Sequence, residues 1–112
     1  MNANFSAADA AVRRVFGYSL FPTQLRCAEA LLNGRIVEMQ TGEGKTLAAV
    51  PAAAALAREL RGVHILTAND YLAQRDAEWM APVYRELGLR AAWVRQTSTP
   101  QQRKQAYAAD VT

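Results

Sequence analysis

The sequence predicts an α/β fold in which a parallel β-sheet carries helices on both faces. Short runs of β-branched and apolar residues at 35–39, 63–67 and 91–95 have the composition of buried strands. Segments of helical composition separate these runs, and parallel strands require crossover connections of that kind. Alternating strands and helices are typical of a parallel sheet that is covered on both sides.

Proline and glycine mark most of the expected helix ends. Pro22 and Pro100 suit first helical positions, because the first turn of a helix leaves its amide hydrogens unpaired and proline has none. Gly17, Gly34 and Gly88 suit helix termination, because glycine readily adopts the left-handed backbone conformation. The expected helices span residues 8–16, 22–32, 45–60, 70–87 and 100–109.

The length of the chain limits how much of such a fold it can contain. A chain of 112 residues allows one domain. Residues 110–112 resemble the opening of a fourth strand, whereas parallel sheets covered on both faces normally contain more strands than three and a half. We therefore expect a sheet that is truncated after about three strands, in the first part of a larger domain.

Composition excludes several functional classes. The net charge of +3 provides no obvious surface for a polyanion such as nucleic acid. Cys27 is the only cysteine, which excludes an intramolecular disulfide and fits a reducing compartment. No apolar run approaches the ~20 residues that span a bilayer. The N-terminus lacks the pattern of a secretory signal, so we expect a soluble chain without a transmembrane segment.

The segment Met-Gln-Thr-Gly-Glu-Gly-Lys-Thr at 39–46 is the most informative part of the sequence. It follows a predicted strand and opens a predicted helix, which is the context that a phosphate-binding P-loop requires. Gly42 and Gly44 allow consecutive backbone amides to point at phosphate oxygens. Lys45 is expected to reach the β- and γ-phosphates, and the Thr46 hydroxyl to ligate Mg²⁺.

Two features of this segment leave alternatives open. The strict P-loop pattern has glycine where this chain has Met39, so the Thr-Gly-x-Gly-Lys-Thr form of helicase-like motors fits better. The alternative structure is a glycine-rich surface turn with a solvated lysine. Glu43 belongs to the candidate nucleotide-binding loop, although a carboxylate there is more typical of a solvated side chain than of a general base.

Blocks of sequence on both sides of the loop resemble the SecA family, the ATP-driven motors of bacterial preprotein export. These blocks follow one another in the order and at the spacing of the family, and the resemblance extends from about residue 11 to residue 112. Thr-Gly-Glu-Gly-Lys-Thr alone would indicate only a related motor. The blocks are VRRVFG at 12–17, QL at 24–25, GRIVEMQTGEGKTL at 34–47 and TANDYLAQRDAEWM at 67–80.

The resemblance implies a fold and a domain assignment. Residues 1–112 correspond to the N-terminal portion of the DEAD-like nucleotide-binding domain of SecA, and that portion is incomplete. The fold implied is a partial P-loop NTPase of the RecA-like type, a three-layer sandwich. Met39 belongs to the SecA version of the loop, which removes the objection to its first position.

The resemblance also implies roles for residues outside the loop. Gln24 corresponds to the glutamine that reads the adenine edge, and its amide can donate and accept at once. The alternative is a polar residue on an exposed helix face. Asn69, Asp70 and Arg75 correspond to a motif that couples the nucleotide site to the rest of the motor. Asp70 is equally suited to begin a helix.

The function implied is the ATP-binding portion of a protein-translocase motor that couples ATP hydrolysis to preprotein export. Hydrolysis needs a Walker B acidic pair and arginine fingers from a second motor domain, and the 112 residues contain no adjacent Asp-Glu pair. The chain alone is therefore not expected to be catalytic. The expected ligands are ATP, ADP and Mg²⁺, and the expected partners are the membrane translocation channel and preproteins. The expected location is the cytoplasmic side of the membrane, peripherally bound.

Three other interpretations remain open at this point. The chain could belong to a nucleic-acid helicase, because the loop and Gln24 serve both classes of motor. It could be a non-catalytic module that binds a nucleotide or a partner. It could also be a truncated product that folds poorly, since an incomplete sheet leaves an open edge.

Overall fold

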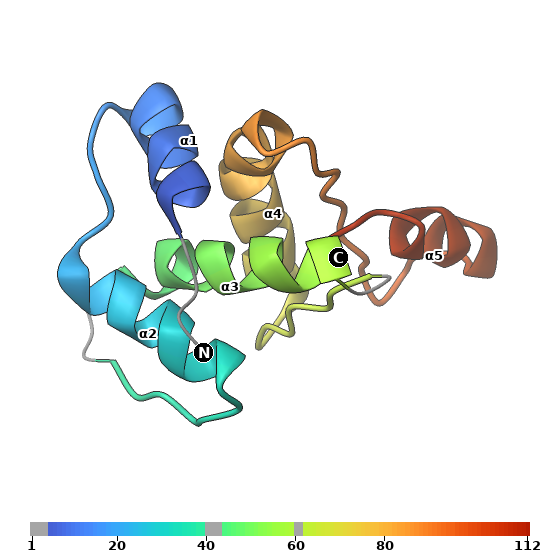
Figure 1. Cartoon of the computed structure of the whole chain (residues 1–112). Helices are drawn as coiled ribbons and strands as arrows, with labels where there is room; N and C mark the ends of the chain where they lie inside the picture. Colours follow the sequence, from blue (N-terminus) through green and yellow to red (C-terminus); the bar gives the residue numbers. More distant parts are fainter. Residues whose placement is uncertain (1–4, 40–43, 60–61) are drawn as a thin grey trace.

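The structure is a computed structural model, which describes residues 5–39, 44–59 and 62–112 (Figure 1). Five helices lie within these residues, and their bounds agree with the predicted ones to within two residues. They are α1 (Ser6–Phe16), α2 (Pro22–Leu32), α3 (Lys45–Glu59), α4 (Asp70–Glu86) and α5 (Pro100–Tyr107).

Local signals explain where several of these helices begin and end. Pro22 and Pro100 occupy the first turns of α2 and α5, as predicted. The side chain of Asn69 accepts a hydrogen bond of 2.9 Å from the Leu72 amide and so caps α4. Gly17 ends α1 with a φ of 79°.

Helix α3 lies at the centre of the molecule. It packs most extensively against α2 and also contacts α1 and α4 (Figure 1). Its alanine-rich middle is buried on several faces, because small side chains let neighbouring helices approach from more than one side. The main core is formed by Ala11, Val12, Leu20, Leu47, Val50, Ala53, Met80, Val83, Tyr84 and Val111.

The segments predicted as strands are extended, but they form little sheet structure. Val111 makes two isolated parallel bridges, one to Val63 and one to Ala91. The Ile65 amide donates to the Thr112 carbonyl at 2.8 Å. Within the described residues, residues 110–112 therefore lie between the segments that begin at Val63 and Ala91.

The prediction of a parallel sheet inside a three-layer sandwich is wrong for the structure described here. The described residues form helices and two isolated bridges, and no sheet. Ile36, at the centre of the first predicted strand, is fully exposed, and Leu66 in the second is 91% exposed. A helix completes its hydrogen bonds within itself, whereas a strand needs neighbours on both sides. The pattern of β-branched residues therefore identified extended segments, but it did not show which segments pair with one another.

Helix α5 projects from the rest of the molecule and contributes no buried residue (Figure 1). Its capping box is complete, because Thr99 and Gln102 each accept a hydrogen bond from the backbone amide of the other. None of the helices in the described residues is long and apolar enough to span a bilayer.

Candidate functional site

Four of the predicted nucleotide-binding residues lie where α2 meets the start of α3. Gln24 belongs to α2, and Lys45 and Thr46 form the first turn of α3. Gly44 immediately precedes α3. Two further predicted residues, Gly42 and Glu43, lie outside the residues that the structure describes.

Gln24 is buried, with only 2% of its surface exposed. Its Oε1 accepts a hydrogen bond of 2.8 Å from the Phe21 amide, and its Nε2 donates to the Gly44 carbonyl at 3.3 Å. The alternative of a polar residue on an exposed helix face is therefore wrong. A buried amide of this kind is stable only when its polar atoms have partners.

Gly44 occupies a position that favours glycine for two reasons. Its φ of +76° lies in the left-handed region, which L-residues with side chains rarely adopt. A Cβ at this position would stand 2.4 Å from the Nε2 of Gln24. The Gly44 carbonyl also accepts the first hydrogen bond of α3, at 3.0 Å from the Ala48 amide. One backbone carbonyl thus joins the start of α3 to a side chain of α2.

The first turn of α3 has the electrostatics of an anion-binding helix terminus. It contains no acidic residue, so no side-chain charge within it opposes the positive end of the helix dipole. Lys45 is exposed, and no carboxylate of the described residues forms an ion pair with it. A lysine at the start of a helix can add its positive charge to that of the helix dipole.

A small apolar cluster lies between α2, the start of α3 and the segment that ends at Met39. Met39, Cys27 and Ala48 are buried together, with Val37 packed against them. These residues come from the segment before the loop, from α2 and from α3. Burial raises the pKa of the Cys27 thiol, which keeps it protonated and unsuited to nucleophilic chemistry. Cys27 is thus a packing residue.

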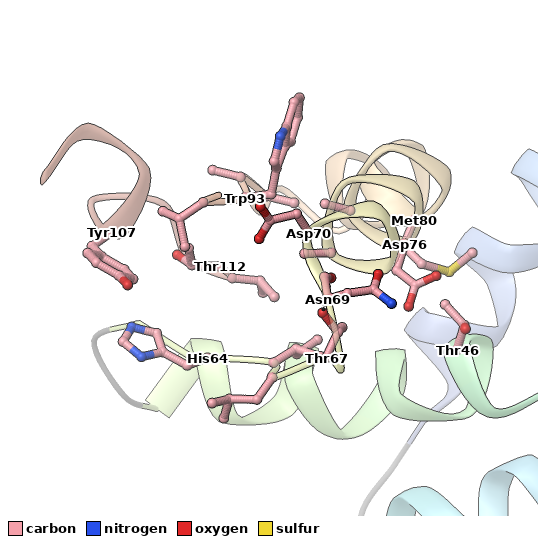
Figure 2. Close-up of a pocket in the computed structure, with 18 of the residues that line it drawn as sticks. Thr46, His64, Thr67, Asn69, Asp70, Asp76, Met80, Trp93, Tyr107 and Thr112 are labelled. Atoms are coloured by element: carbon pink, nitrogen blue, oxygen red, sulfur yellow. Dashed lines mark hydrogen bonds between the residues drawn. The ribbon is translucent and has the colours of Figure 1, made fainter. Parts of the chain in front are cut away.

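Thr46 is one of the residues that line a cavity of about 380 Å³. Asn69 and Asp76 lie at the same end of this cavity as Thr46, whereas His64 and Tyr107 lie at the opposite end (Figure 2). Its walls come from the start of α3, from residues 64–70, from α4, from residues 91–96, and from Tyr107, Val111 and Thr112.

Most polar groups in this cavity are already engaged within the protein. The Asp70 carboxylate accepts a hydrogen bond of 3.1 Å from the Gln96 amide, and it joins the start of α4 to the segment after residue 95. The Thr67 hydroxyl donates to the Asn69 carbonyl at 3.0 Å. Arg75 does not line the cavity and instead pairs with Asp76 at 2.9 Å.

Tyr84 is a cavity residue that sequence reasoning missed. It is 2% exposed, and its hydroxyl has no hydrogen-bond partner among the described residues. Burial raises the pKa of Tyr84 far above its usual value, so the hydroxyl stays protonated. The four-residue spacing between Met80 and Tyr84 on α4 was the available signal, since it puts both side chains on one helix face.

His64 lies at the Tyr107 end of the cavity (Figure 2). Its side chain is exposed, and its ring lies 5.0 Å from the ring of Tyr107. The described residues contain no group of three His, Cys, Asp or Glu side chains that could hold a metal ion.

Comparisons with known proteins identify the family. The sequence model of the SecA DEAD-like domain matches residues 1–112. The chain is 52% identical to protein translocase subunit SecA 2 of Thermobifida fusca over 102 residues, which is 91% of this chain and 13% of that protein. It is 50% identical to protein translocase subunit SecA of Thermus thermophilus over 108 residues, 96% of this chain and 11% of that protein.

The chain thus spans about an eighth of the length of these curated relatives. The family match covers the candidate site from Gln24 to Thr46 and the walls of the cavity, because it extends over residues 1–112. The resemblance seen in the sequence blocks is confirmed. The chain belongs to the SecA DEAD-like domain family.

Proposed function

We propose that this chain is a nucleotide-binding part of a protein-translocase motor and that ATP or ADP binds at the start of α3. The observation that carries the proposal is the conformation of Gly44. It holds a φ of +76° directly before Lys45 and Thr46, at a helix start without acidic residues. That arrangement suits backbone amides and a lysine that must approach phosphate oxygens closely.

Each residue of the site has a distinct proposed role. The Lys45 ammonium binds the β- and γ-phosphates, and the amides of Gly42, Glu43 and Gly44 surround them. The Thr46 hydroxyl holds Mg²⁺, with nucleotide oxygens and water as its other ligands, which fits the lack of a side-chain metal cluster in the described residues. Bound Mg²⁺ would neutralise phosphate charge. Gln24 is the candidate for adenine recognition.

The proposed function extends to protein export on the strength of family membership. The relatives compared above are named protein translocase subunits. We therefore propose a preprotein-export role at the cytoplasmic side of the membrane, with the translocation channel and preproteins as partners. The 112 residues contain no adjacent Asp-Glu pair, so the expected activity of this chain alone is nucleotide binding without steady hydrolysis.

The test compares the only two lysines of the chain. Lys45→Ala should weaken the binding of a fluorescent ADP analogue by at least about tenfold, because a charge-assisted hydrogen bond to phosphate contributes roughly 1.5–3 kcal/mol. Lys104→Ala, an exposed position on α5, should leave the affinity unchanged. Equal affinities for the wild-type chain and Lys45→Ala would contradict the proposed site.

Two further measurements separate this function from its alternatives. Lys45-dependent steady ATP turnover by the chain would contradict the proposal that it binds without hydrolysis. Affinity for RNA or DNA that falls steeply with salt would favour a nucleic-acid motor instead. A preference for ATP over GTP that disappears in Gln24→Ala would support adenine recognition by Gln24.

A further inference from the structure

Gln24 connects two backbone groups that belong to different helix starts. Its Oε1 binds the amide of Phe21, which precedes α2, and its Nε2 binds the carbonyl of Gly44, which precedes α3. Twenty residues separate Gln24 from Gly44 in sequence. A single buried amide therefore fixes how the two helix starts lie relative to each other.

Gly44 has little freedom to move while Gln24 is in place. A Cβ there would lie 2.4 Å from Nε2 and 3.6 Å from Cδ of Gln24, so the side chain packs directly against the glycine backbone. The carbonyl between them also receives the Ala48 amide. The orientation of the Gly44 peptide is thus determined by one bond from within α3 and one from α2.

We infer that Gln24 is a positioning residue, which holds the Gly44 peptide in the orientation that phosphate binding requires. The inference rests on the proposed nucleotide site and adds a role that does not depend on the base. A residue that only reads adenine affects ATP and leaves a ligand without a base untouched. A residue that positions Gly44 affects every ligand whose phosphates bind at the start of α3.

The ligand that separates these roles is inorganic triphosphate with Mg²⁺, which has phosphates and no base. Gln24→Glu keeps an acceptor for the Phe21 amide but turns an oxygen toward the Gly44 carbonyl. Gln24→Ala removes both bonds and serves where the glutamate variant does not fold. Either variant should weaken triphosphate binding by about tenfold, the usual consequence of a lost buried hydrogen bond of this strength.

The matched control is Gln102→Glu on α5. Gln102 makes the same bond to the amide that precedes its own helix, at 2.8 Å, but its side chain is exposed and lies outside the site. Its substitution should leave triphosphate affinity within twofold of wild type. Triphosphate affinity that is likewise unchanged in folded Gln24 variants would overturn the inference.

A double-variant experiment tests the contact without any ligand. Gln24→Ala removes the group that a Cβ at position 44 would meet, so Gly44→Ala should lower the urea midpoint less in the Gln24→Ala chain than in wild type. Additive losses would overturn the positioning role. Coupled losses in a chain that binds neither triphosphate nor ATP would support the contact and contradict the proposed nucleotide site instead.

Discussion

The two glutamines that begin α2 and α5 make the same local hydrogen bond in opposite surroundings. Gln24 and Gln102 each occupy the third position of a helix that starts with proline. Each accepts a hydrogen bond of 2.8 Å from the amide that precedes the helix. Gln102 is exposed, whereas Gln24 is 2% exposed and also binds the Gly44 carbonyl.

The difference shows that a local helix-capping motif and a contact between distant segments can use the same side chain. The complete box at Thr99 and Gln102 needs only the four residues that form it, so sequence alone determines it. At α2, Phe21 has no side-chain acceptor, and only the glutamine half of the box remains. The second bond of Gln24 exists because α2 packs on α3. The buried side chain of Gln24 therefore caps α2 and also links α2 to the residue before α3.

The largest change in the free energy of unfolding is expected from adding a methyl group at Gly44. Gly44 and Gly88 have the same φ of +76°, but nothing lies within 4 Å of a Cβ at Gly88. Gly88→Ala should cost about 1 kcal/mol of unfolding free energy, the strain of a left-handed residue. Gly44→Ala should cost about 3 kcal/mol, because the new Cβ also displaces Gln24.

Urea unfolding of the two variants measures this difference. The two glycines share a φ of +76°, so the excess cost at position 44 reports the packing against Gln24. Equal midpoints for Gly44→Ala and Gly88→Ala would mean that the Gln24 side chain moves aside freely. The distinction drawn between Gln24 and Gln102 would then have no energetic basis.

Sequence could predict the local features of this molecule and not the long-range ones. The five helices of the described residues could be predicted from proline, glycine and apolar spacing, because a helix bonds residues four apart. The parallel sheet was predicted wrongly, since Ile36 and its neighbours have strand composition but no pairing partner in the described residues. Strand composition indicates that a segment is able to form a strand. It does not show which other segment of the chain would pair with it.

The candidate site divides in the same way. The spacing of Gly44, Lys45 and Thr46 was enough to predict them as candidate site residues. Gln24 was predicted because the chain resembles the SecA family. The bond between Gln24 and the Gly44 carbonyl could not, because it depends on how α2 packs against α3. The nucleotide roles of these residues stay predictions that the binding experiments above test.

A smaller change in stability, of opposite sign, is expected from substitution of Tyr84. This side chain is buried and polar like Gln24 but differs from it in hydrogen bonding. Both residues are 2% exposed, but the Tyr84 hydroxyl has no partner in the described part of the chain. A buried hydroxyl without a partner carries an uncompensated desolvation cost. Tyr84→Phe should therefore leave stability unchanged or raise it by up to about 1 kcal/mol.

Chemical unfolding of Tyr84→Phe and Gln24→Ala in parallel tests the contrast. Removing satisfied polar atoms should destabilise the chain, whereas removing an unsatisfied one should not. A loss of more than about 1 kcal/mol in Tyr84→Phe would show that the hydroxyl has a partner in solution, such as an ordered water in the cavity.

The smallest effect is expected at Asp9, which fixes the backbone just before the α2 box. Its Oδ1 accepts a hydrogen bond of 2.8 Å from the Leu20 amide, and its Oδ2 binds the Arg13 guanidinium, with Nε at 3.1 Å. The bond from Arg13, followed by that from Leu20, lowers the pKa of Asp9 below its usual 3.8. The α5 box has no carboxylate in an equivalent position, since Thr99 and Gln102 are neutral.

Because the pKa of Asp9 is lowered in the folded chain, its ionised side chain stabilises the fold above pH 3.8. This stabilisation is lost as the pH falls through the folded-state pKa. Asp9→Asn should thus cost less than about 1 kcal/mol at pH 7, and the cost should shrink below pH 4 as the wild-type carboxyl takes up its proton. Gln102→Ala should cost the same at both pH values, because a neutral box does not titrate. Urea midpoints of both variants at pH 7 and pH 3 provide the comparison. A cost for Asp9→Asn that stayed constant with pH would mean that the Leu20 bond works equally well with a neutral side chain, and that charge contributes nothing to how α1 supports the α2 box.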